Sequence, residues 1–248
     1  MGELTGKVAI VTGASKGIGA AIARAFAEAG AAVAVNYASN KADADRVVSE
    51  IVKAGGKAVA IQADVAKRAD VKRLFQETIQ KLGRPNILVN NAGVYSFAPL
   101  ESVTEGDFHR QFDTNVLGTI LATQEAVKAF NGAGGSVINL STISSTNPSP
   151  NTLVYSASKS AIDSITRELA IELAGKGIRV NAIAPGMTET EGFTAAGLSA
   201  ESAKALGFSL PMGRIGRPDD IARVALFLAS DQSEWVTGER IAVSGGQR

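Results

Sequence analysis

Three things that the sequence lacks narrow what the protein can be. It has no cysteine, which excludes disulfide bonds, thiol catalysis and cysteine-ligated metal. Its 25 lysines and arginines nearly balance 24 aspartates and glutamates, and a net charge of +1 does not indicate a nucleic-acid or membrane-surface partner. It has no apolar run of about 18 residues and no signal-peptide stretch at its start. We therefore expect a cytoplasmic protein with a small-molecule partner.

Histidine is also scarce. The single histidine, His109, has no evident partner that would make it a metal ligand or a catalytic base, so we treat it as a surface residue. With no cysteine and one histidine, we expect no metal site.

What the sequence does contain is a regular alternation of short apolar runs and longer amphipathic stretches. The short runs predict strands at residues 8–11, 32–36, 58–61, 87–89, 136–140, 178–183 and 240–243, and the long stretches predict helices at 18–29, 41–53, 71–82, 107–130, 155–174 and 219–229. This alternation builds βαβ units and a parallel sheet. We expect one α/β domain over residues 1–248, a Rossmann-type, doubly wound parallel sheet of about seven strands with helices on both faces.

A glycine-rich turn follows the first expected strand. It reads Thr12-Gly13-Ala14-Ser15-Lys16-Gly17-Ile18-Gly19, with the spacing G-x-x-x-G-x-G. Glycines at such a turn let backbone N–H groups approach a pyrophosphate, and the helix N-terminus favours the anion. The turn lacks the G-K-[ST] ending of a P-loop, which disfavours a nucleotide triphosphatase. We expect a dinucleotide to bind at Gly13, Ser15, Lys16, Gly17, Ile18 and Gly19.

The end of the second expected strand indicates which dinucleotide is bound. An NAD-specific site usually has Asp or Glu there, which accepts hydrogen bonds from the ribose 2′-hydroxyl. This chain has Asn36, Tyr37, Ala38 and Ser39 instead, with Lys41 following and Lys16 in the glycine turn. The missing carboxylate and the two cations favour NADP(H) over NAD(H). The alternative is that both lysines are merely solvated surface residues.

Tyr155 and Lys159 are four residues apart, in a segment with apolar residues at helical intervals. Positions i and i+4 share one face of a helix, so the phenol and the ammonium can point into one site. A free tyrosine has a pKa of about 10, and a cation beside it favours the phenolate. The pattern is weak on its own, because many helices contain it by chance.

Together with other motifs, this pair makes the chain resemble the short-chain dehydrogenase/reductase family. The matching motifs, in chain order, are Thr12-Gly13-x-x-x-Gly17-x-Gly19, Asp64-Val65, Asn90-Asn91-Ala92-Gly93, Asn115, Tyr155-x-x-x-Lys159 and Pro185-Gly186 with Thr188. They span nearly the whole chain, and their joint order and spacing are specific although several are weak alone. The resemblance implies an oxidoreductase with a nicotinamide cofactor.

The resemblance also implies roles for the matching residues at the adenosine end of the cofactor. Asp64 would hydrogen-bond the adenine amino group, and Val65 would supply backbone contacts. Asn91, Ala92 and Gly93 would line the adenosine ribose. From the residues alone, Asp64 could instead cap the helix that follows it.

At the nicotinamide end, the resemblance makes Lys159 the residue that holds the ribose hydroxyls and lowers the pKa of Tyr155, the general acid or base. Asn115 would anchor a water in a proton relay to Lys159. The backbone of residues 183–186 and the Thr188 hydroxyl would hold the carboxamide. From the residues alone, Asn115 could be a buried hydrogen-bonding group, and the Pro-Gly pair could be only a turn.

The chain departs from the family pattern at one hydroxyl. The family normally has a serine thirteen residues before the tyrosine, and that position is Thr142 here. A threonine keeps a hydroxyl that can donate to a carbonyl oxygen, but its methyl stiffens the side chain and crowds the site. Ser141 and Ser144 are near enough to replace it, because Pro148 and Pro150 make the loop irregular. We expect Thr142 to take the role, with Ser144 next.

Residues 187–210 have features of a lid that closes over a substrate, namely many small residues and several glycines. Phe193 and Leu206 could wall an apolar pocket, to which we also assign Val94, Tyr95, Ser144 and Leu153. The alternative is a small surface helix without a substrate role.

These features predict an NADP(H)-dependent ketone reductase or alcohol dehydrogenase, with Asn115, Thr142, Tyr155 and Lys159 as its catalytic residues. By analogy with the family, we expect a homotetramer.

Two other functions stay open. The first is 3-oxoacyl-acyl-carrier-protein reduction, although Ala133 and Ile171 stand where that group has basic residues for the carrier protein. The second is a non-catalytic NADP(H)-binding sensor, against which the intact set of catalytic residues argues.

Overall fold

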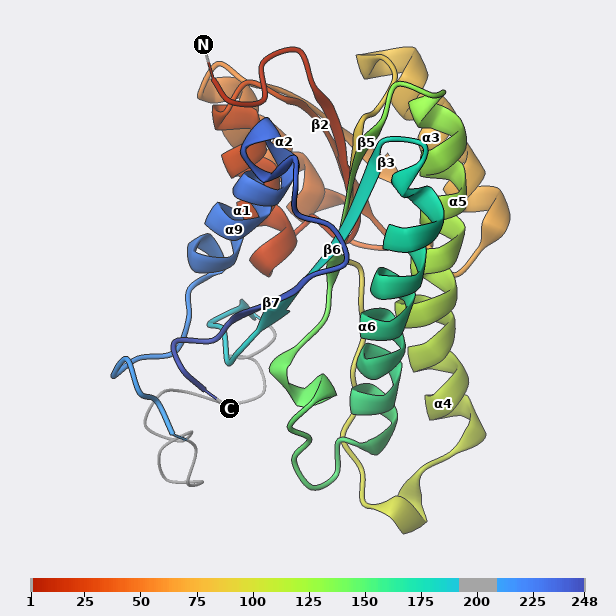
Figure 1. The fold of residues 1–248 in the computed structure, drawn as a ribbon, viewed down its shortest axis with the longest axis vertical. Coiled ribbons are helices and arrows are strands. Elements are labelled where there is room, and N and C mark those ends of the chain that lie inside the picture. Colours follow the sequence, from red (N-terminus) through yellow and green to blue (C-terminus); the bar gives the residue numbers. More distant parts are fainter. Residues whose placement is uncertain (1, 192–208, 248) are drawn as a thin grey trace.

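The computed structural model describes residues 2–191 and 209–247. Its centre is a seven-stranded parallel sheet with the order β3-β2-β1-β4-β5-β6-β7 (Figure 1). The strands are β1 (Val8–Val11), β2 (Ala32–Tyr37), β3 (Lys57–Gln62), β4 (Ile87–Asn90), β5 (Gly135–Leu140), β6 (Ile178–Pro185) and β7 (Arg240–Val243). Nearly every residue of β1, β2, β4, β5 and β6 is buried, as expected for strands that are covered on both faces.

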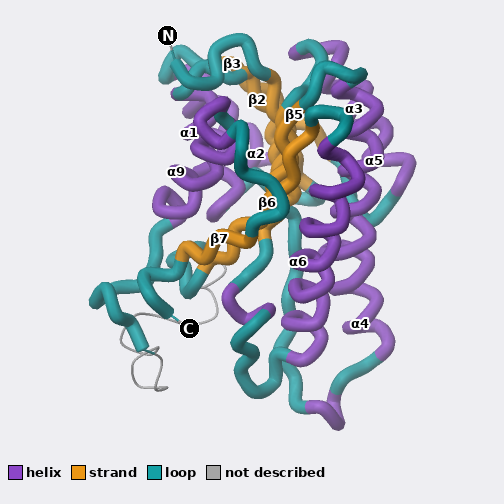
Figure 2. The backbone as a smooth tube through the Cα atoms, viewed as in Figure 1, coloured by secondary structure: helices purple, strands orange, loops and turns teal. Residues whose placement is uncertain are grey.

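Helices cover both faces of this sheet. One face carries α1 (Gly17–Glu28), α2 (Lys41–Lys53) and α9 (Pro218–Ala229), and the other carries α3 (Arg68–Leu82), α5 (Gly118–Phe130) and α6 (Leu153–Ala174). Figure 2 shows the strands running between these two groups. The doubly wound α/β fold predicted from the sequence is confirmed. Among the described residues, no helix has the length and apolar character needed to span a bilayer.

The chain reverses its direction across the sheet at β1. It runs outward from β1 to β2 and β3, and then returns to pair β4 with the other side of β1. In open α/β sheets, such a point leaves a crevice beyond the carboxyl ends of the strands, where ligands bind. The glycine turn after β1 and the segment after β4 both lie at this edge.

The helix predicted over residues 107–130 is interrupted. α4 (Glu105–Phe112) begins after Thr104, whose hydroxyl accepts a hydrogen bond from the Asp107 N–H at 3.1 Å. A π-helical turn, Asp113–Leu117, then joins α4 to α5. Such turns accommodate an extra residue and often occur at functional sites. This one contains Asn115.

Candidate active site

A cleft of about 610 Å³ opens beyond the carboxyl ends of β4, β5 and β6. Segments far apart in the sequence meet there: residues 91–97 after β4, residues 140–152 after β5, residues 185–190 after β6, and the start of α6. The predicted site residues in its lining are Ile18, Asn91, Gly93, Val94, Tyr95, Thr142, Ser144, Tyr155, Lys159, Pro185, Gly186 and Thr188. The fold therefore brings three of the four predicted catalytic residues, Thr142, Tyr155 and Lys159, together with residues expected at the nicotinamide end, whereas Asn115 does not line the cleft.

The glycine turn has a backbone that favours glycine. Gly13 and Gly17 have φ of +60° and +56°, in the left-handed region. A side chain on Gly19 would overlap Asn91 and would lie 2.6 Å from the Gly13 carbonyl oxygen. α1 begins here without a side-chain cap from Lys16 and without an acidic residue in its first turn. The positive end of the helix is therefore suited to an anion.

The Asn36 side chain supports this turn from the interior of the protein and does not face the surface. It is 1% exposed. Its side-chain oxygen accepts a hydrogen bond from the Gly13 N–H at 3.1 Å, and its Nδ2 donates to the carbonyls of Ile61 (3.2 Å) and Ala63 (3.1 Å). Because its amide is committed to holding the turn, Asn36 would act on a cofactor through the turn and not through a side-chain contact of its own.

Thr12 and Asn91 join the turn to the end of β4. The Asn91 amide donates to the carbonyls of Thr12 (2.8 Å) and Gly13 (3.0 Å). In return, the Thr12 hydroxyl accepts from the N–H groups of Asn91 and Ala92, both at 3.0 Å. Asn91 thus braces the glycine turn and also lines the cleft. Thr12 thus helps to hold the site together. It belongs to the matched motif, but we did not predict this role from the sequence.

The predicted ribose-phosphate position lies at the end of β2. Ala38 and Ser39 are exposed there, whereas Tyr37 is buried. Lys16 is exposed in the glycine turn. Lys41 is paired within its own helix, since its Nζ lies 2.5 Å from Asp45 Oδ2, and this hydrogen bond raises the pKa of Lys41. The charge that Lys41 would bring to a phosphate is therefore partly neutralised.

Asp64 organises the turn that follows β3. Its Oδ1 accepts a hydrogen bond from the Ala66 N–H at 3.1 Å, and its Oδ2 lies 3.4 Å from Lys67 Nζ. The residue at the N-cap of α3 is Lys67, so the alternative that Asp64 caps this helix is wrong. Val65 is buried and packs where a side chain on Gly118 would overlap it.

Asn115 links three segments. Its Oδ1 accepts from the Val94 N–H at 2.8 Å, and its Nδ2 donates to the Val94 carbonyl (2.9 Å) and to the Ser158 hydroxyl (3.0 Å). The segment after β4, the π-helical turn and α6 are thereby joined. A side chain on Gly93 would lie 3.3 Å from Asn115 Oδ1 and 3.5 Å from Lys159 Nζ, so glycine keeps this corner open.

Tyr155 and Lys159 occupy neighbouring turns at the start of α6 and both line the cleft. Burial lowers the pKa of Lys159 to about 8, and the Asp163 carboxylate acts against this decrease. Burial raises the pKa of Tyr155 to about 12, and a side-chain hydrogen bond with Thr142 acts against this increase. Lys159 is not among the groups that shift the pKa of Tyr155 here, so its lowering of that pKa stays a prediction. Lys159 Nζ donates to the Leu140 carbonyl at 2.7 Å, and removal of the phenol from water dominates.

The three hydroxyls near Tyr155 have different environments. Thr142 is close enough to Tyr155 to lower the pKa of the phenol, and its own oxygen accepts from the Ser144 N–H at 3.3 Å. Ser144 also lines the cleft. The Ser141 hydroxyl donates to Asp163 Oδ1 at 2.5 Å and is buried. Of the three, Thr142 has the placement expected for the hydroxyl that acts beside Tyr155.

Beyond β6, the chain is held by the C-terminal segment. The Thr188 hydroxyl donates to the Gly186 carbonyl at 3.0 Å, and the Met187 N–H donates to Gln247 Oε1 at 2.8 Å. Gln247 is buried and lines the cleft. A side chain on Gly186 would overlap Gln247 and would lie 2.9 Å from Ser244 Cα. Gln247 was not predicted, because nothing in the local sequence indicates that the end of the chain folds back onto this loop.

Aromatic rings form one side of the cleft. Tyr95 and Phe97 are stacked with centroids 5.3 Å apart, and their centroids lie 6.0 and 6.1 Å from that of Tyr155. Phe97 was not predicted. Leu153 is 53% exposed and is not among the described residues that line the cleft, contrary to prediction. Two other predicted pocket residues, Phe193 and Leu206, lie outside the described residues.

The sequence is similar to known oxidoreductases over its whole length. The family model described as enoyl-(acyl carrier protein) reductase matches residues 13–248. The chain is 54% identical to an uncharacterized oxidoreductase of Methylorubrum extorquens, over 100% of both chains. It is 42% identical to a hydroxynaphthalene reductase-like protein of Metarhizium robertsii, over 98% of this chain and 96% of that one.

The fold is similar to solved structures as well. A double phenylalanine-to-leucine mutant of a short-chain dehydrogenase/reductase from Serratia marcescens matches with a TM-score of 0.92 and 37% identity, over 98% of both chains. A short-chain type dehydrogenase/reductase from Mycobacterium marinum also matches with a TM-score of 0.92 and 37% identity, over 98% of this chain and 96% of that one. The chain therefore belongs to the short-chain dehydrogenase/reductase family of oxidoreductases, which bind a nicotinamide cofactor.

Proposed function

We propose that the protein is an NADP(H)-dependent oxidoreductase that reduces a ketone or aldehyde to an alcohol, reversibly. The observation that carries this proposal is the convergence of Thr142, Tyr155 and Lys159 on one cleft, where Thr142 is close enough to Tyr155 to lower the pKa of the phenol. A carbonyl oxygen beside the two hydroxyls would receive a hydrogen bond from each. A developing alkoxide needs such donors.

Each of these side chains has a defined task. When bound, the nicotinamide cofactor would supply a hydride to the carbonyl carbon. Tyr155 donates its proton to the alkoxide oxygen during reduction and accepts it during oxidation. Because its pKa is about 12, Tyr155 is protonated at neutral pH and is ready to act as an acid. Lys159, with a pKa of about 8, is mainly cationic at neutral pH and stabilises the phenolate that remains. Thr142 polarises the carbonyl.

The residues present fit a dinucleotide. The uncapped N-terminus of α1 suits the pyrophosphate, and Gly93 and Gly186 keep the cleft open where a flat ring and a ribose would lie. Lys159 would hold the ribose hydroxyls, and Thr188 and the backbone after β6 would hold the carboxamide. Asp64 and Val65 would border the adenine.

The preference for NADP(H) rests on fewer residues than the sequence suggests. Asn36 is buried and Lys41 is paired with Asp45, so neither supports the preference. What remains is the lack of a carboxylate at residues 36–40 and the exposed cation of Lys16. An acidic side chain there would repel a 2′-phosphate, whereas Lys16 attracts it.

The aromatic side of the cleft supports a substrate with a flat apolar group beside its carbonyl. Tyr95 and Phe97 are 47% and 55% exposed next to Tyr155, and rings of this kind stack favourably on other aromatic rings. The similarity to a protein named as hydroxynaphthalene reductase-like agrees with such a substrate. We therefore propose aryl ketones before simple alkyl ketones.

A carrier-protein-bound acyl substrate is the second candidate, favoured by the description of the matching family model. Against it, Ile171 is an apolar side chain, 80% exposed, where the corresponding reductases have a basic residue.

We further propose a cytoplasmic homotetramer. The exposed apolar side chains of Leu117, Ile171 and Trp235 support association with other subunits.

The test is a panel of aryl ketones, alkyl ketones and a 3-oxoacyl thioester, with and without carrier protein, followed by the absorbance of NADPH. We expect turnover of aryl ketones, loss of turnover in Tyr155→Phe, and NADPH affinity in that variant within about twofold of the wild type. Unchanged turnover in Tyr155→Phe would contradict the mechanism. Tight NADPH binding without turnover of any carbonyl or alcohol would favour the sensor. Equal efficiency with NADH and NADPH would contradict the cofactor preference.

A further inference from the structure

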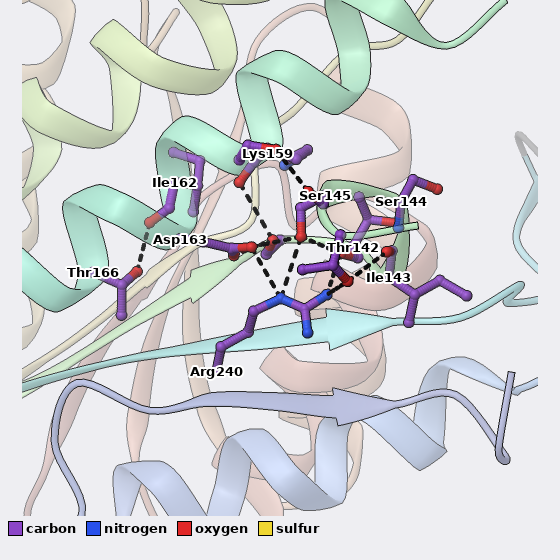
Figure 3. A network of polar contacts seen from close by, with 12 residues as sticks. Thr142, Ile143, Ser144, Ser145, Lys159, Ile162, Asp163, Thr166 and Arg240 are labelled. Atoms are coloured by element: carbon purple, nitrogen blue, oxygen red, sulfur yellow. Dashed lines mark hydrogen bonds and ion pairs between the residues drawn. The ribbon is translucent and has the colours of Figure 1, made fainter. Parts of the chain in front are cut away.

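An ion pair behind the cleft joins the last strand of the sheet to α6. Arg240, the first residue of β7, has its Nε 2.9 Å from Asp163 Oδ2 (Figure 3). The Asp163 side chain is 7% exposed and that of Arg240 is 20% exposed. Neither residue is among the described residues that line the cleft, so neither is placed to touch a substrate.

Both oxygens of the Asp163 carboxylate hold the loop that carries Thr142. The Ser141 hydroxyl donates to Oδ1 and the Ser145 hydroxyl donates to Oδ2, each at 2.5 Å. These serines flank Thr142, one directly before it and the other three residues after it. The carboxylate therefore fixes both ends of the short segment that contains the Thr142 hydroxyl (Figure 3).

Arg240 holds the same segment through its backbone. Its Nη2 donates to the Thr142 carbonyl at 2.8 Å and to the Thr146 hydroxyl at 3.3 Å. Its Nε also lies 3.2 Å from the Ser145 hydroxyl. A planar guanidinium can make these contacts together because its donors form a rigid fork, whereas a lysine ammonium cannot span them.

Asp163 belongs to the same helix as the catalytic tyrosine. It follows Lys159 by four residues and Tyr155 by eight, so the three lie along one face of α6. The Ser141 hydroxyl also lies 3.5 Å from the Lys159 carbonyl. The ion pair therefore connects the loop with the Thr142 hydroxyl to the helix with the Tyr155 hydroxyl.

Stability alone does not account for this arrangement. The free-energy cost of removing two charges from water offsets most of their attraction. A buried ion pair therefore contributes little more to the stability of the fold than apolar residues of the same size would. What the pair does supply is a fixed geometry, because each of its atoms makes directional contacts with one loop.

We propose that Arg240 and Asp163 are positioning residues of this active site, which hold the Thr142 hydroxyl against Tyr155. The proposal rests on the proposed function. A displacement of the loop by about 1 Å would remove the second hydrogen bond to the carbonyl oxygen and slow the chemical step by up to about 100-fold. Cofactor binding, which depends mainly on the glycine turn and on other residues outside this loop, would change little.

The experiment compares Arg240→Met, Arg240→Lys and Asp163→Asn with Arg179→Met. Arg179 is the matched control: it also joins a strand to a neighbouring segment, because it donates to the Leu228 carbonyl at 2.9 Å and the Ser233 hydroxyl at 2.7 Å, away from the catalytic loop. For the ketone found in the panel, we expect kcat to decrease about 10- to 100-fold in Arg240→Met and Asp163→Asn. The Kd for NADPH should stay within about twofold, and kcat of Arg179→Met should stay near the wild-type value at a temperature where every variant is folded.

A double mutant separates positioning from a general structural role. If Arg240 acts through the Thr142 hydroxyl, then Arg240→Met should reduce kcat much less in a Thr142→Ala background than in the wild type. The proposal would be overturned if the fold-decreases in kcat of the two single variants multiply in the double variant. It would also be overturned if kcat is unchanged in Arg240→Met. Should Arg240→Met fail to fold, Ser145→Ala and Arg240→Lys, which each remove part of the network, give the same comparison. Failure of the wild type to turn over any carbonyl would instead contradict the proposed function, so the two failures are distinguishable.

Discussion

The side-chain oxygen of Asn36 accepts a hydrogen bond from the backbone N–H of Gly13, 3.1 Å away. The same amide donates to carbonyls of the segment that ends β3, so one buried side chain joins three strands at the cofactor edge. Asn36 occupies the sequence position that usually selects the cofactor, but its side chain sets the shape of the turn that would bind any dinucleotide.

Replacement of Asn36 should therefore weaken the binding of both cofactors by similar factors. In Asn36→Ala, the Gly13 N–H and the carbonyls of Ile61 and Ala63 lose their partner, and we expect a decrease of about 1–3 kcal/mol in the free energy of unfolding. The Kd values for NADPH and NADH should rise by similar factors, as measured by titration calorimetry. Lys16→Ala is the control, because it should weaken the binding of NADPH much more than the binding of NADH. A change in the NADPH/NADH ratio in Asn36→Ala would contradict this role.

The methyl and the hydroxyl of Thr142 can be tested separately. Thr142→Val keeps the shape of the side chain and removes the hydroxyl beside Tyr155, so kcat should decrease about 100- to 1000-fold. Thr142→Ser keeps the hydroxyl and should stay within about tenfold of the wild type. Steady-state kinetics with Ser144→Ala complete the comparison. A larger loss in Ser144→Ala than in Thr142→Val would make Ser144 the polarising residue.

Lys159 should make stability depend on pH in the alkaline range. Its pKa is about 8 in the folded protein against 10.5 for an ordinary lysine, so the unfolded state binds more protons between these values. The stability of the wild type relative to Lys159→Met should therefore rise from about pH 8 to pH 10, by at most about 3 kcal/mol. Tyr155, with its pKa raised to about 12, has the opposite effect above pH 10, so the comparison stays below that pH.

Urea unfolding followed by circular dichroism measures this difference. Trp235 is 96% exposed, which makes its fluorescence a poor probe of unfolding. A stability difference between the two proteins that does not change from pH 7.5 to 10 would show that Lys159 is not desolvated.

Two glycines provide a matched test of the cofactor turn. In Gly19→Ala the new methyl group would overlap Asn91 and the Gly13 carbonyl, so the turn must move, at a cost of about 1–3 kcal/mol in stability. We expect NADPH affinity to decrease at least about tenfold. In Gly106→Ala, within α4, the nearest atom would be 3.8 Å away, and stability should stay the same or rise by up to about 1 kcal/mol. Equal effects of the two changes on NADPH binding would contradict a special role for Gly19.

The aromatic pair should determine substrate preference. Phe97→Ala removes a ring that is stacked on Tyr95 and lies 6.1 Å from Tyr155. An aromatic contact contributes about 0.5–1.5 kcal/mol, so kcat/KM for an aryl ketone should decrease about 2- to 12-fold more than for an alkyl ketone. Competition between two such ketones measures the ratio directly. Identical decreases for both would mean that the rings do not contact the substrate.

The sheet, its helices and the cleft could be predicted because they depend on local patterns. Apolar runs of strand length predict strands, and the carboxyl ends of parallel strands meet at one edge. Tyr155 and Lys159 could be placed on one face of α6 from their spacing alone. The π-helical turn around Asn115 could not, because it depends on hydrogen bonds to Val94 and Ser158 from other elements.

The residue roles that we did not predict from the sequence have a common physical cause. A polar side chain can bind a ligand or satisfy a neighbouring backbone group, and the outcome depends on partners that the fold supplies. Asn36 finds Gly13 23 residues earlier, and Arg240 finds Thr142 98 residues earlier. Spacing within one segment carries no information on either contact.

The pairing of β1 with β4 also affects how the chain folds. The Thr12 hydroxyl donates to the Val89 carbonyl, 77 residues further along, so the strand that carries the glycine turn lacks one neighbour until a large loop has closed. Contacts this distant in sequence form slowly. A dinucleotide that binds only the completed edge would stabilise the folded state by mass action. We therefore expect refolding yields to increase when NADPH is present.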